Sequence, residues 1–241
     1  MSRRGVPKTP PPGPGDLLTR GDITVKGRLP RSSNITFLVE VCLDGVVALA
    51  VYKPERGERP LWDFPPGLFV RELAAYHLSE ALGWGLVPLT IRREGPHGDG
   101  SLQLFIRADF SQHYFTLRED RAHHAQLQRI CAFDLITNNG DRKGGHCLLG
   151  PDRKIYAVDN GLCFHVDLKL RTVIWDFGGS PIPEDITADL GRLAESGLPA
   201  SLTELLDASE QEVLLARIAW VVEEGVFPED PGGHAYPWPL V

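Results

Sequence analysis

The chain has 241 residues, of which 42% are hydrophobic, so it can bury a sizeable core as one large domain or as two packed lobes. Its formal net charge of -7, with lysines and arginines scattered along the chain, excludes a general nucleic-acid binder, because affinity for a phosphate backbone requires a basic surface. The four cysteines form no CxxC pair, which favours a reducing compartment, and we expect a cytoplasmic protein.

The N-terminal stretch MSRRGVPKTPPPGPG contains two arginines but no apolar run behind them, so it does not predict a signal peptide. Its composition is typical of a flexible linker, and we expect residues 1–18 to be a flexible Pro/Gly-rich arm. Nowhere does an apolar stretch approach the roughly 20 residues that span a bilayer. The sequence therefore predicts no transmembrane segment.

A β-rich region follows the arm. Stretches rich in β-branched residues, separated by turn residues, predict strands over 21–29, 34–43, 45–53, 87–94 and 101–108. The last two strands flank the turn GPHGDG at 95–100. Between the third and fourth strands, residues 68–82 predict a helix that ends at Gly83. Residues 19–108 are thus expected to form a β-rich lobe with one helix.

The pattern becomes helical from residue 121. Residues 121–138 predict a helix with an apolar stripe, and the stretches HCLLG and IYAVD predict a hairpin around the turn PDRK. From residue 186 onward the chain is expected to be helical, with capping boxes at Ser201 with Glu204 and at Ser209 with Glu212. Residues 109–241 therefore predict a mainly helical lobe that contains one hairpin, and the fold class is α+β.

Small ligands usually bind in a cleft between lobes, and two residues of the first lobe point to such a ligand. Lys53 ends a predicted strand, and Glu72 follows on the predicted helix. A lysine on a strand can reach nucleotide phosphates while a glutamate on a helix holds its ammonium group by an ion pair. Taken singly, each residue is more typical of a solvated surface than of a nucleotide site.

Two acidic residues flank the predicted hairpin. Asp141 begins DRKGGH before the first strand, and Asp159 begins DNG at the end of the second. Phosphoryl transfer needs an acidic residue that orients or deprotonates the attacking hydroxyl and a hard oxygen ligand for Mg²⁺. The hairpin can present both carboxylates, and the order Lys53, Glu72, Asp141, Asp159 favours this chemistry over turn or loop roles.

This set of residues resembles the kinase superfamily, and its DRK and DNG motifs resemble the phosphatidylinositol 3-/4-kinase branch, more narrowly the short actinobacterial homologues of that branch. The resemblance covers roughly residues 20–225 and implies a two-lobed protein-kinase-like fold that uses ATP and Mg²⁺. It implies that Asp141 is the catalytic base, Asp159 the principal metal ligand, and Lys53 the phosphate-binding lysine with Glu72 as its partner. Lys143 is placed to neutralise the transferred phosphoryl group.

The resemblance also assigns two nucleotide-binding segments. The turn GRLPRSSN occupies the place of the loop that covers the phosphates, where Ser32, Ser33 and Asn34 offer hydroxyl, amide and backbone donors. The last predicted strand of the β-rich lobe leads into the connection between lobes, where the backbone near Phe105 and Ile106 is expected to bind adenine.

His146 departs from the pattern, because this branch carries a metal-binding Asn five positions after the catalytic Asp. Imidazole nitrogen is a softer ligand than an amide oxygen and prefers transition metals. Three alternatives follow: a single metal held by Asp159, a site with His146 as a ligand that favours Mn²⁺, or nucleotide binding without efficient transfer. Cys147, Cys163 and His165 lie nearby in sequence, but their apolar context favours core packing over a zinc site.

A literal DFG occurs in WDFGG at 175–179, but no predicted hairpin strand leads into it. We therefore assign Asp176 to the substrate-facing segment, together with Lys169 and Arg171. The leading hypothesis is an ATP-dependent phosphotransferase whose acceptor is a protein, a small molecule or a lipid headgroup. The alternative is a nucleotide-binding pseudokinase that acts through a protein partner. The sequence does not identify the acceptor, does not distinguish Mg²⁺ from Mn²⁺ and does not indicate the oligomeric state.

Overall fold

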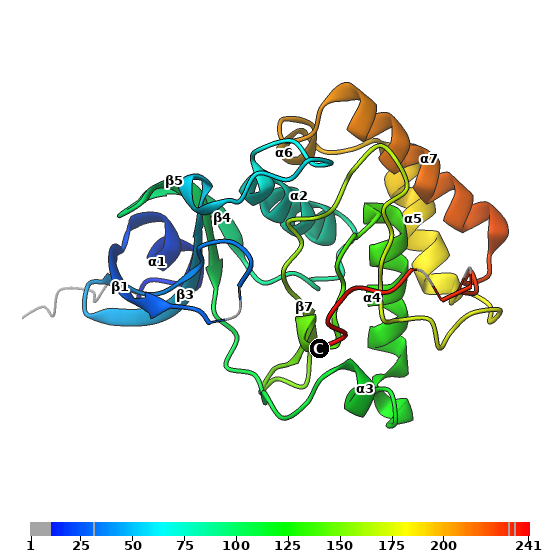
Figure 1. Cartoon of the computed structure of the whole chain (residues 1–241), viewed down its shortest axis with the longest axis horizontal. Helices are drawn as coiled ribbons and strands as arrows, with labels where there is room; N and C mark the ends of the chain where they lie inside the picture. Colours follow the sequence, from blue (N-terminus) through cyan, green and yellow to red (C-terminus); the bar gives the residue numbers. More distant parts are fainter. Residues whose placement is uncertain (1–10, 31, 231, 234) are drawn as a thin grey trace, which may run out of the picture.

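The computed structural model describes residues 11–30, 32–230, 232–233 and 235–241, and it arranges them in two lobes. One lobe is an antiparallel sheet, and the other consists mainly of helices with a short hairpin (Figure 1). This is the two-lobed α+β architecture that the sequence predicts.

The sheet of the first lobe has five strands in the order β1-β2-β3-β5-β4, and every neighbouring pair is antiparallel. Alternating side chains such as Val39, Val41, Ala50 and Tyr52 are fully buried and form the small core of this lobe. The strands are β1 (Asp22–Arg28), β2 (Phe37–Leu43), β3 (Val46–Pro54), β4 (Thr90–Gly95) and β5 (Gly98–Leu104). Because β3 is paired on both sides, the position of Lys53 near its end is well fixed.

The predicted turn over residues 95–100 is too long. Strands β4 and β5 continue through Gly95 and Gly98, which pair with each other, and leave a two-residue turn. Gly100 lies within β5, where an added Cβ atom would be 2.3 Å from the carbonyl oxygen of Lys53. The glycine is therefore needed for the close approach of β3 and β5 rather than for a loop.

The predicted flexible arm is also too long. Residues 1–10 lie outside the described residues, but α1 (Pro14–Arg20) is a helix where part of the arm was expected. Pro14 stands at the start of this helix, where its fixed φ is compatible with helical geometry. Leu17 and Leu18 are buried, and Leu18 belongs to the core under the sheet. Burial of these two leucines offsets the entropy cost of ordering this segment, which its Pro/Gly composition had suggested would stay flexible.

The second lobe follows the order that the sequence predicts, except that the described residues after Glu224 form no helix, although helix was predicted from residue 186 onward. Its helices and strands are α3 (Tyr114–Leu117), α4 (His124–Thr137), β6 (Cys147–Leu149), β7 (Ile155–Ala157), α5 (Glu184–Ser196), α6 (Ala200–Thr203) and α7 (Ala208–Glu224), with short 3₁₀ turns at η2 (Arg121–His123) and η3 (Gly144–His146). A third 3₁₀ turn, η1 (Glu55–Gly57), follows β3 in the first lobe. Strands β6 and β7 pair as the predicted hairpin. Of the helices within the described ranges, none is long and apolar enough to cross a bilayer.

Helix α2 (Leu68–Ala81) connects the two lobes, and Figure 1 shows it between the sheet and the helices of the second lobe. Its buried residues Ala74, Ala75 and Leu78 belong to the same hydrophobic cluster as Leu127 and Ile130 of α4. Helix α2 also packs against β4 and β5, so it contacts both lobes, although the sequence places this helix within the first.

Both predicted capping boxes are wrong. Ser201 lies inside α6, and Ser209 lies in the first turn of α7. The actual box of α7 uses Asp207, whose Oδ1 accepts a hydrogen bond from the Glu210 N–H at 2.8 Å, while Glu210 Oε2 accepts one from the Asp207 N–H at 3.0 Å. Asp is as strong an N-cap residue as Ser, so two overlapping signatures competed in the sequence.

We expect Asp207→Ala to destabilise the protein by about 1 kcal/mol, because it removes the N-cap of the longest helix. Ser209→Ala is the matched control and should change the free energy of unfolding by less than about 0.5 kcal/mol. Urea unfolding of both variants measures the difference. A larger loss for Ser209→Ala would restore the box predicted from the sequence.

Candidate active site

Lys53, Glu72 and Asp159 come together from β3, α2 and the turn after β7. The Lys53 ammonium donates hydrogen bonds to Glu72 Oε1 and, at 2.7 Å, to Asp159 Oδ1. Burial alone would lower the pKa of Lys53, but the carboxylates of Asp159 and Glu72 raise it above its ordinary value. Lys53 is therefore a charged ammonium group held between two carboxylates.

Glu72 also fixes the turn that carries Asp159. Its side chain is 3% exposed, and its second oxygen, Oε2, accepts a hydrogen bond from the Asn160 N–H at 3.0 Å. Asp159 itself has a left-handed backbone with a φ of 60°, a conformation that non-glycine residues rarely adopt without support. The single carboxylate of Glu72 thus aligns both Lys53 and the Asp159 turn.

The carboxylate of Asp159 is accessible, with 53% of its side chain exposed. The Lys53 ammonium lowers the pKa of Asp159 below its ordinary value, so this side chain stays ionised. Its Oδ2 lies 3.5 Å from His146 Nε2. The side chain offers hard oxygen ligands of the kind that Mg²⁺ prefers.

Asp141 lies beside Lys143, with 3.0 Å between Asp141 Oδ2 and Lys143 Nζ. The backbone N–H of Asp141 donates to Asn139 Oδ1 at 2.9 Å, which fixes the start of the loop. Burial raises the pKa of Asp141, the hydrogen bond and charge of Lys143 oppose that shift, and the charge of Asp159 adds to it. Asp141 is therefore a carboxylate with increased proton affinity next to a cation, as a general base requires.

A fully buried ion pair lies beneath these loops. Arg142 Nη2 is 2.9 Å from Asp134 Oδ1, and both side chains are 0% exposed. Arg142 also donates to the carbonyl oxygen of Val158 and to Asn160 Oδ1, each at 2.7 Å. Arg142 therefore holds the loop of Asp141 against the turn of Asp159.

Sequence reasoning missed Asp134, Asn139, Arg142 and Asn160. Asn139 Nδ2 donates to Asp134 Oδ1 at 3.2 Å, so the same buried carboxylate also anchors the residue that holds the Asp141 backbone. One signal was present: Asp134 interrupts the apolar stripe of α4, where a charge must find a partner to be buried.

His146 lies next to Asp159 as the sequence indicated, but its hydrogen bonds constrain what it can do. The Lys143 N–H donates to His146 Nδ1 at 3.3 Å. A neutral imidazole that accepts at Nδ1 carries its proton on Nε2, the nitrogen that faces Asp159. Burial lowers the pKa of His146 to about 4; nearby cations add to this shift and Asp159 opposes it. In this arrangement His146 is a neutral donor toward Asp159 and has no free nitrogen lone pair for a metal.

The turn assigned to the phosphates lies between β1 and β2. Its Asn34 Oδ1 accepts a hydrogen bond from the Arg59 N–H at 2.9 Å, so the turn is tied to the segment after β3. Arg31 of the same turn lies outside the described residues. Among the described residues, no hydrogen bond joins Ser32, Ser33 or Asn34 to the groups around Asp159. Their role toward phosphate stays a prediction.

Phe105 and Ile106 lie in the connection between β5 and α3, as expected. The Phe105 N–H donates to the carbonyl oxygen of Leu49 at 3.0 Å, and the Ile106 carbonyl accepts from the Ala108 N–H at 2.8 Å. The Phe105 N–H is thus occupied by the sheet. Adenine binding by the backbone near Phe105 and Ile106 stays a prediction.

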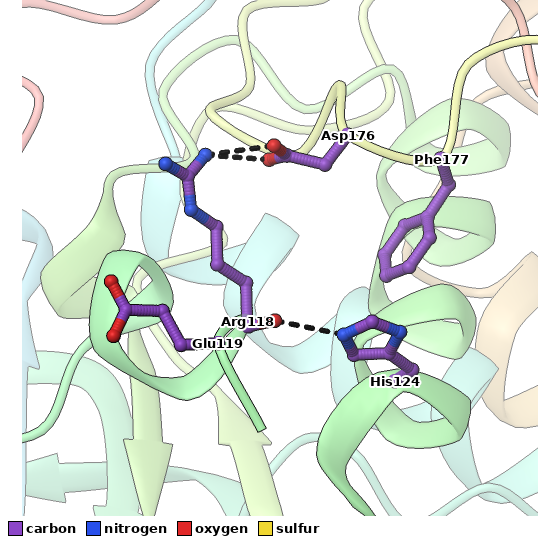
Figure 2. Close-up of a pocket in the computed structure, with 5 residues that line it drawn as sticks. All are labelled: Arg118, Glu119, His124, Asp176 and Phe177. Atoms are coloured by element: carbon purple, nitrogen blue, oxygen red, sulfur yellow. Dashed lines mark hydrogen bonds and ion pairs between the residues drawn. The ribbon is translucent and has the colours of Figure 1, made fainter. Parts of the chain in front are cut away.

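The literal DFG has partners of its own, and Figure 2 shows its Asp176 paired with Arg118. Both carboxylate oxygens of Asp176 contact Arg118 Nη1, at 2.8 and 2.9 Å, and Asp176 Oδ2 accepts a hydrogen bond from the Tyr114 hydroxyl. The pair borders a cavity of about 430 Å³ that is lined by Arg118, Glu119, His124, Asp176 and Phe177. Asp176 therefore ties its loop to α3, whereas Asp159 faces Lys53.

The other two residues of the assigned substrate-facing segment lie closer to Asp141. Lys169 Nζ is 3.2 Å from Asp63 Oδ2 and 5.4 Å from the ring centre of Trp62. The Arg171 N–H donates to the carbonyl oxygen of Asn139 at 2.8 Å, and Arg171 is exposed. The segment thus runs alongside the loop that carries Asp141.

The residues around Asp159 are suited to a metal ion that is bound together with a nucleotide and are less suited to a permanently bound metal ion. Within the described part of the chain, no group of three or more His, Cys, Asp or Glu side chains could hold a metal ion. Cys147 and Cys163 are fully buried in the hydrophobic core, in agreement with the predicted packing. Because Mg²⁺ is usually bound by one or two carboxylates plus substrate phosphates, Asp159 satisfies the protein's share of such a site.

Comparisons with known proteins agree with the fold. No family model matches the chain. Protein Rv2133c of Mycobacterium tuberculosis is 38% identical over 262 aligned residues, which cover 92% of this chain and 94% of that protein.

Two solved structures share the architecture at low sequence identity. A structure of hydra Fam20 with sugar has a TM-score of 0.59 at 13% identity and covers 87% of both chains. The Helicobacter pylori proinflammatory kinase CtkA has a TM-score of 0.51 at 12% identity and covers 87% of this chain and 94% of its own. At these identities the likeness concerns the fold alone, and it confirms the predicted two-lobed kinase-like fold.

We expect Arg142→Met to destabilise the protein by about 3–5 kcal/mol, because it leaves Asp134 buried without its partner. Arg118→Met breaks a half-exposed ion pair and should cost less than about 1 kcal/mol. Urea unfolding of the two variants compares the losses. Similarly small losses of stability in both variants would show that the ion pair of Asp134 and Arg142 contributes little to the stability of the fold.

We also expect His146 to lower the free energy of unfolding of the metal-free protein at acidic pH. Its pKa is about 4 in the folded chain and near 6.5 in the unfolded chain, so between these values only the unfolded chain binds the proton. Stability is therefore lost as the pH falls through this range. Between pH 7 and pH 5 the parent should lose about 2 kcal/mol more than His146→Asn in urea unfolding. Equal losses of stability in the parent and the variant would indicate that the imidazole of His146 is exposed to solvent.

Proposed function

The chain belongs to the same family as Protein Rv2133c of Mycobacterium tuberculosis, and from this premise we propose that it is an ATP-dependent phosphotransferase. One observation carries the proposal: Lys53 contacts both Glu72 and Asp159, which come from different lobes of a kinase-like fold. Asp141 and Lys143 complete the set that phosphoryl transfer needs.

The nucleotide phosphates bind where the Lys53 ammonium now meets Asp159. A phosphate oxygen can replace Asp159 as a partner of Lys53, while Glu72 keeps the ammonium in place. Asp159 would hold Mg²⁺, with Mn²⁺ as the alternative, and the metal would supply charge neutralisation at the phosphates.

Transfer uses Asp141 and Lys143. Asp141 accepts the proton of the acceptor hydroxyl as its oxygen bonds to the γ-phosphorus, and the bond from that phosphorus to the bridging oxygen breaks to release ADP. The raised pKa of Asp141 suits a proton acceptor, and the Lys143 ammonium neutralises charge on the transferred group.

The acceptor class is open among a protein, a small molecule and a lipid headgroup. The Asp-Arg start of the loop and the spacing from Asp141 to His146 and Asp159 support a relationship to phosphatidylinositol 3-/4-kinases. Fold likeness does not fix a substrate, because one fold carries many chemistries.

A second candidate function is a pseudokinase that binds nucleotide and acts through a protein partner. The observation that favours it is the position of His146, whose Nδ1 accepts the Lys143 N–H and whose Nε2 faces Asp159. If efficient transfer requires a second metal ligand there, the chain would bind nucleotide but transfer slowly.

Thermal-shift titration with ATP and Mg²⁺ or Mn²⁺ tests binding, since a ligand at 100 times its Kd stabilises by about 2.7 kcal/mol. We expect Asp159→Asn to weaken metal-dependent binding, because it removes the metal ligand. Asp141→Asn should leave binding nearly intact and reduce transfer from γ-labelled ATP to lysate acceptors by at least about 100-fold.

Asp176→Asn is the matched control for the metal ligand and should not change metal-dependent binding. If it caused the metal defect and Asp159→Asn did not, the site would be misplaced. Absence of stabilisation with either metal would exclude the nucleotide function, whereas binding by the parent without transfer would favour the pseudokinase.

A further inference from the structure

Arg71, which precedes Glu72 on α2, is a buried arginine with partners in three other parts of the chain. Its side chain is 7% exposed. Its Nη1 donates to the carbonyl oxygen of Cys163 at 2.5 Å, and its Nη2 donates to Glu210 Oε1 at 2.5 Å. The guanidinium carbon also lies 5.5 Å from the ring centre of Phe64.

These partners connect the helix that carries Glu72 to the second lobe. Cys163 follows the turn of Asp159 and Asn160, and Glu210 lies in the first turn of α7. Glu210 is itself held by the capping box, since its Oε2 accepts the Asp207 N–H at 3.0 Å. Arg71 is therefore joined to an anchor that does not depend on the nucleotide site.

The effect on the site follows from the adjacency of Arg71 and Glu72. Besides Arg71, α2 contacts the second lobe through buried apolar residues such as Ala74 and Leu78 and through the bond from the Asn160 N–H to Glu72. Arg71 adds two directional bonds to that lobe at the position next to Glu72. Glu72 then keeps its contacts with Lys53 and with the Asn160 N–H.

We propose that Arg71 is a positioning residue that holds α2 against the Cys163 carbonyl and Glu210, so that the Lys53, Glu72 and Asp159 cluster is assembled before nucleotide binds. Its catalytic consequence rests on the proposed function. An arginine suits this role because its planar fork reaches two acceptors at once, which a lysine ammonium matches poorly.

The main test compares the double variant Arg71→Met/Glu210→Gln with the parent. Removing both charges avoids a buried unpaired carboxylate, and glutamine at position 210 retains the capping box. The matched control is Arg129→Met/Asp185→Asn, which removes an ion pair that joins α4 to α5. Arg71→Lys tests whether positive charge alone is sufficient.

The first readout is hydrogen exchange of residues 158–164 in the nucleotide-free protein. We expect at least about tenfold faster exchange in the double variant, because the Asn160 N–H loses its fixed acceptor. We expect no change in the control and an intermediate rate in Arg71→Lys. Parent-like exchange in a folded double variant would overturn the proposal.

The second readout is the affinity for ATP with Mg²⁺, which should fall at least about tenfold in the double variant and stay unchanged in the control. Urea unfolding of both variants separates this effect from a general loss of stability. If the parent itself bound no ATP, the proposed function would fail, while the exchange measurement would still decide the role of Arg71. Unchanged affinity together with faster exchange would overturn the catalytic consequence.

Discussion

The buried ion pair between Asp134 and Arg142 is the interaction on which the site depends. An unpaired charge at either position would be costly in a low-dielectric interior, so the two side chains fix each other. Because Arg142 follows Asp141 directly and also binds Val158 and Asn160, the same pair determines the separation of the two loops that carry Asp141 and Asp159. Hydrogen-bonded networks of this kind specify one arrangement when every member is satisfied.

The network continues into the first lobe through one side chain. The side-chain oxygen of Asn160 accepts a hydrogen bond from Arg142, and the Asn160 N–H donates to Glu72. Glu72 in turn accepts a hydrogen bond from Lys53. The charge of Asp134, buried on α4, is thus connected through three intermediate residues, Arg142, Asn160 and Glu72, to the lysine at the end of β3. Helix α2 makes this possible because it packs in the core of the second lobe while its Glu72 faces the sheet. The two lobes therefore meet through specific polar contacts and not only through the chain connection.

Much of this could be predicted from sequence, and the limits have physical causes. Strands and helices follow from hydrophobic periodicity, and Lys53, Glu72, Asp141 and Asp159 follow from the chemistry that their order permits. Arg71 could not be found in this way, because a buried arginine looks like a solvated one in sequence and its partner Glu210 is 139 positions away. Helix α1 was missed because two buried leucines outweighed its Pro/Gly composition, and a competing Asp207 signature displaced the predicted capping boxes.

Under the proposed function, the contact between Lys53 and Asp159 couples metal to nucleotide. A metal ion that binds Asp159 alone must displace the Lys53 ammonium or share the carboxylate with it, and two cations at one carboxylate repel each other. Phosphates remove that competition, because they provide Lys53 with another anionic partner. Each ligand then binds more tightly in the presence of the other, and by linkage the two effects are equal in free energy. His146 does not compete with a metal ion for the charge of Asp159, since its neutral Nε2–H faces Asp159 without adding a positive charge.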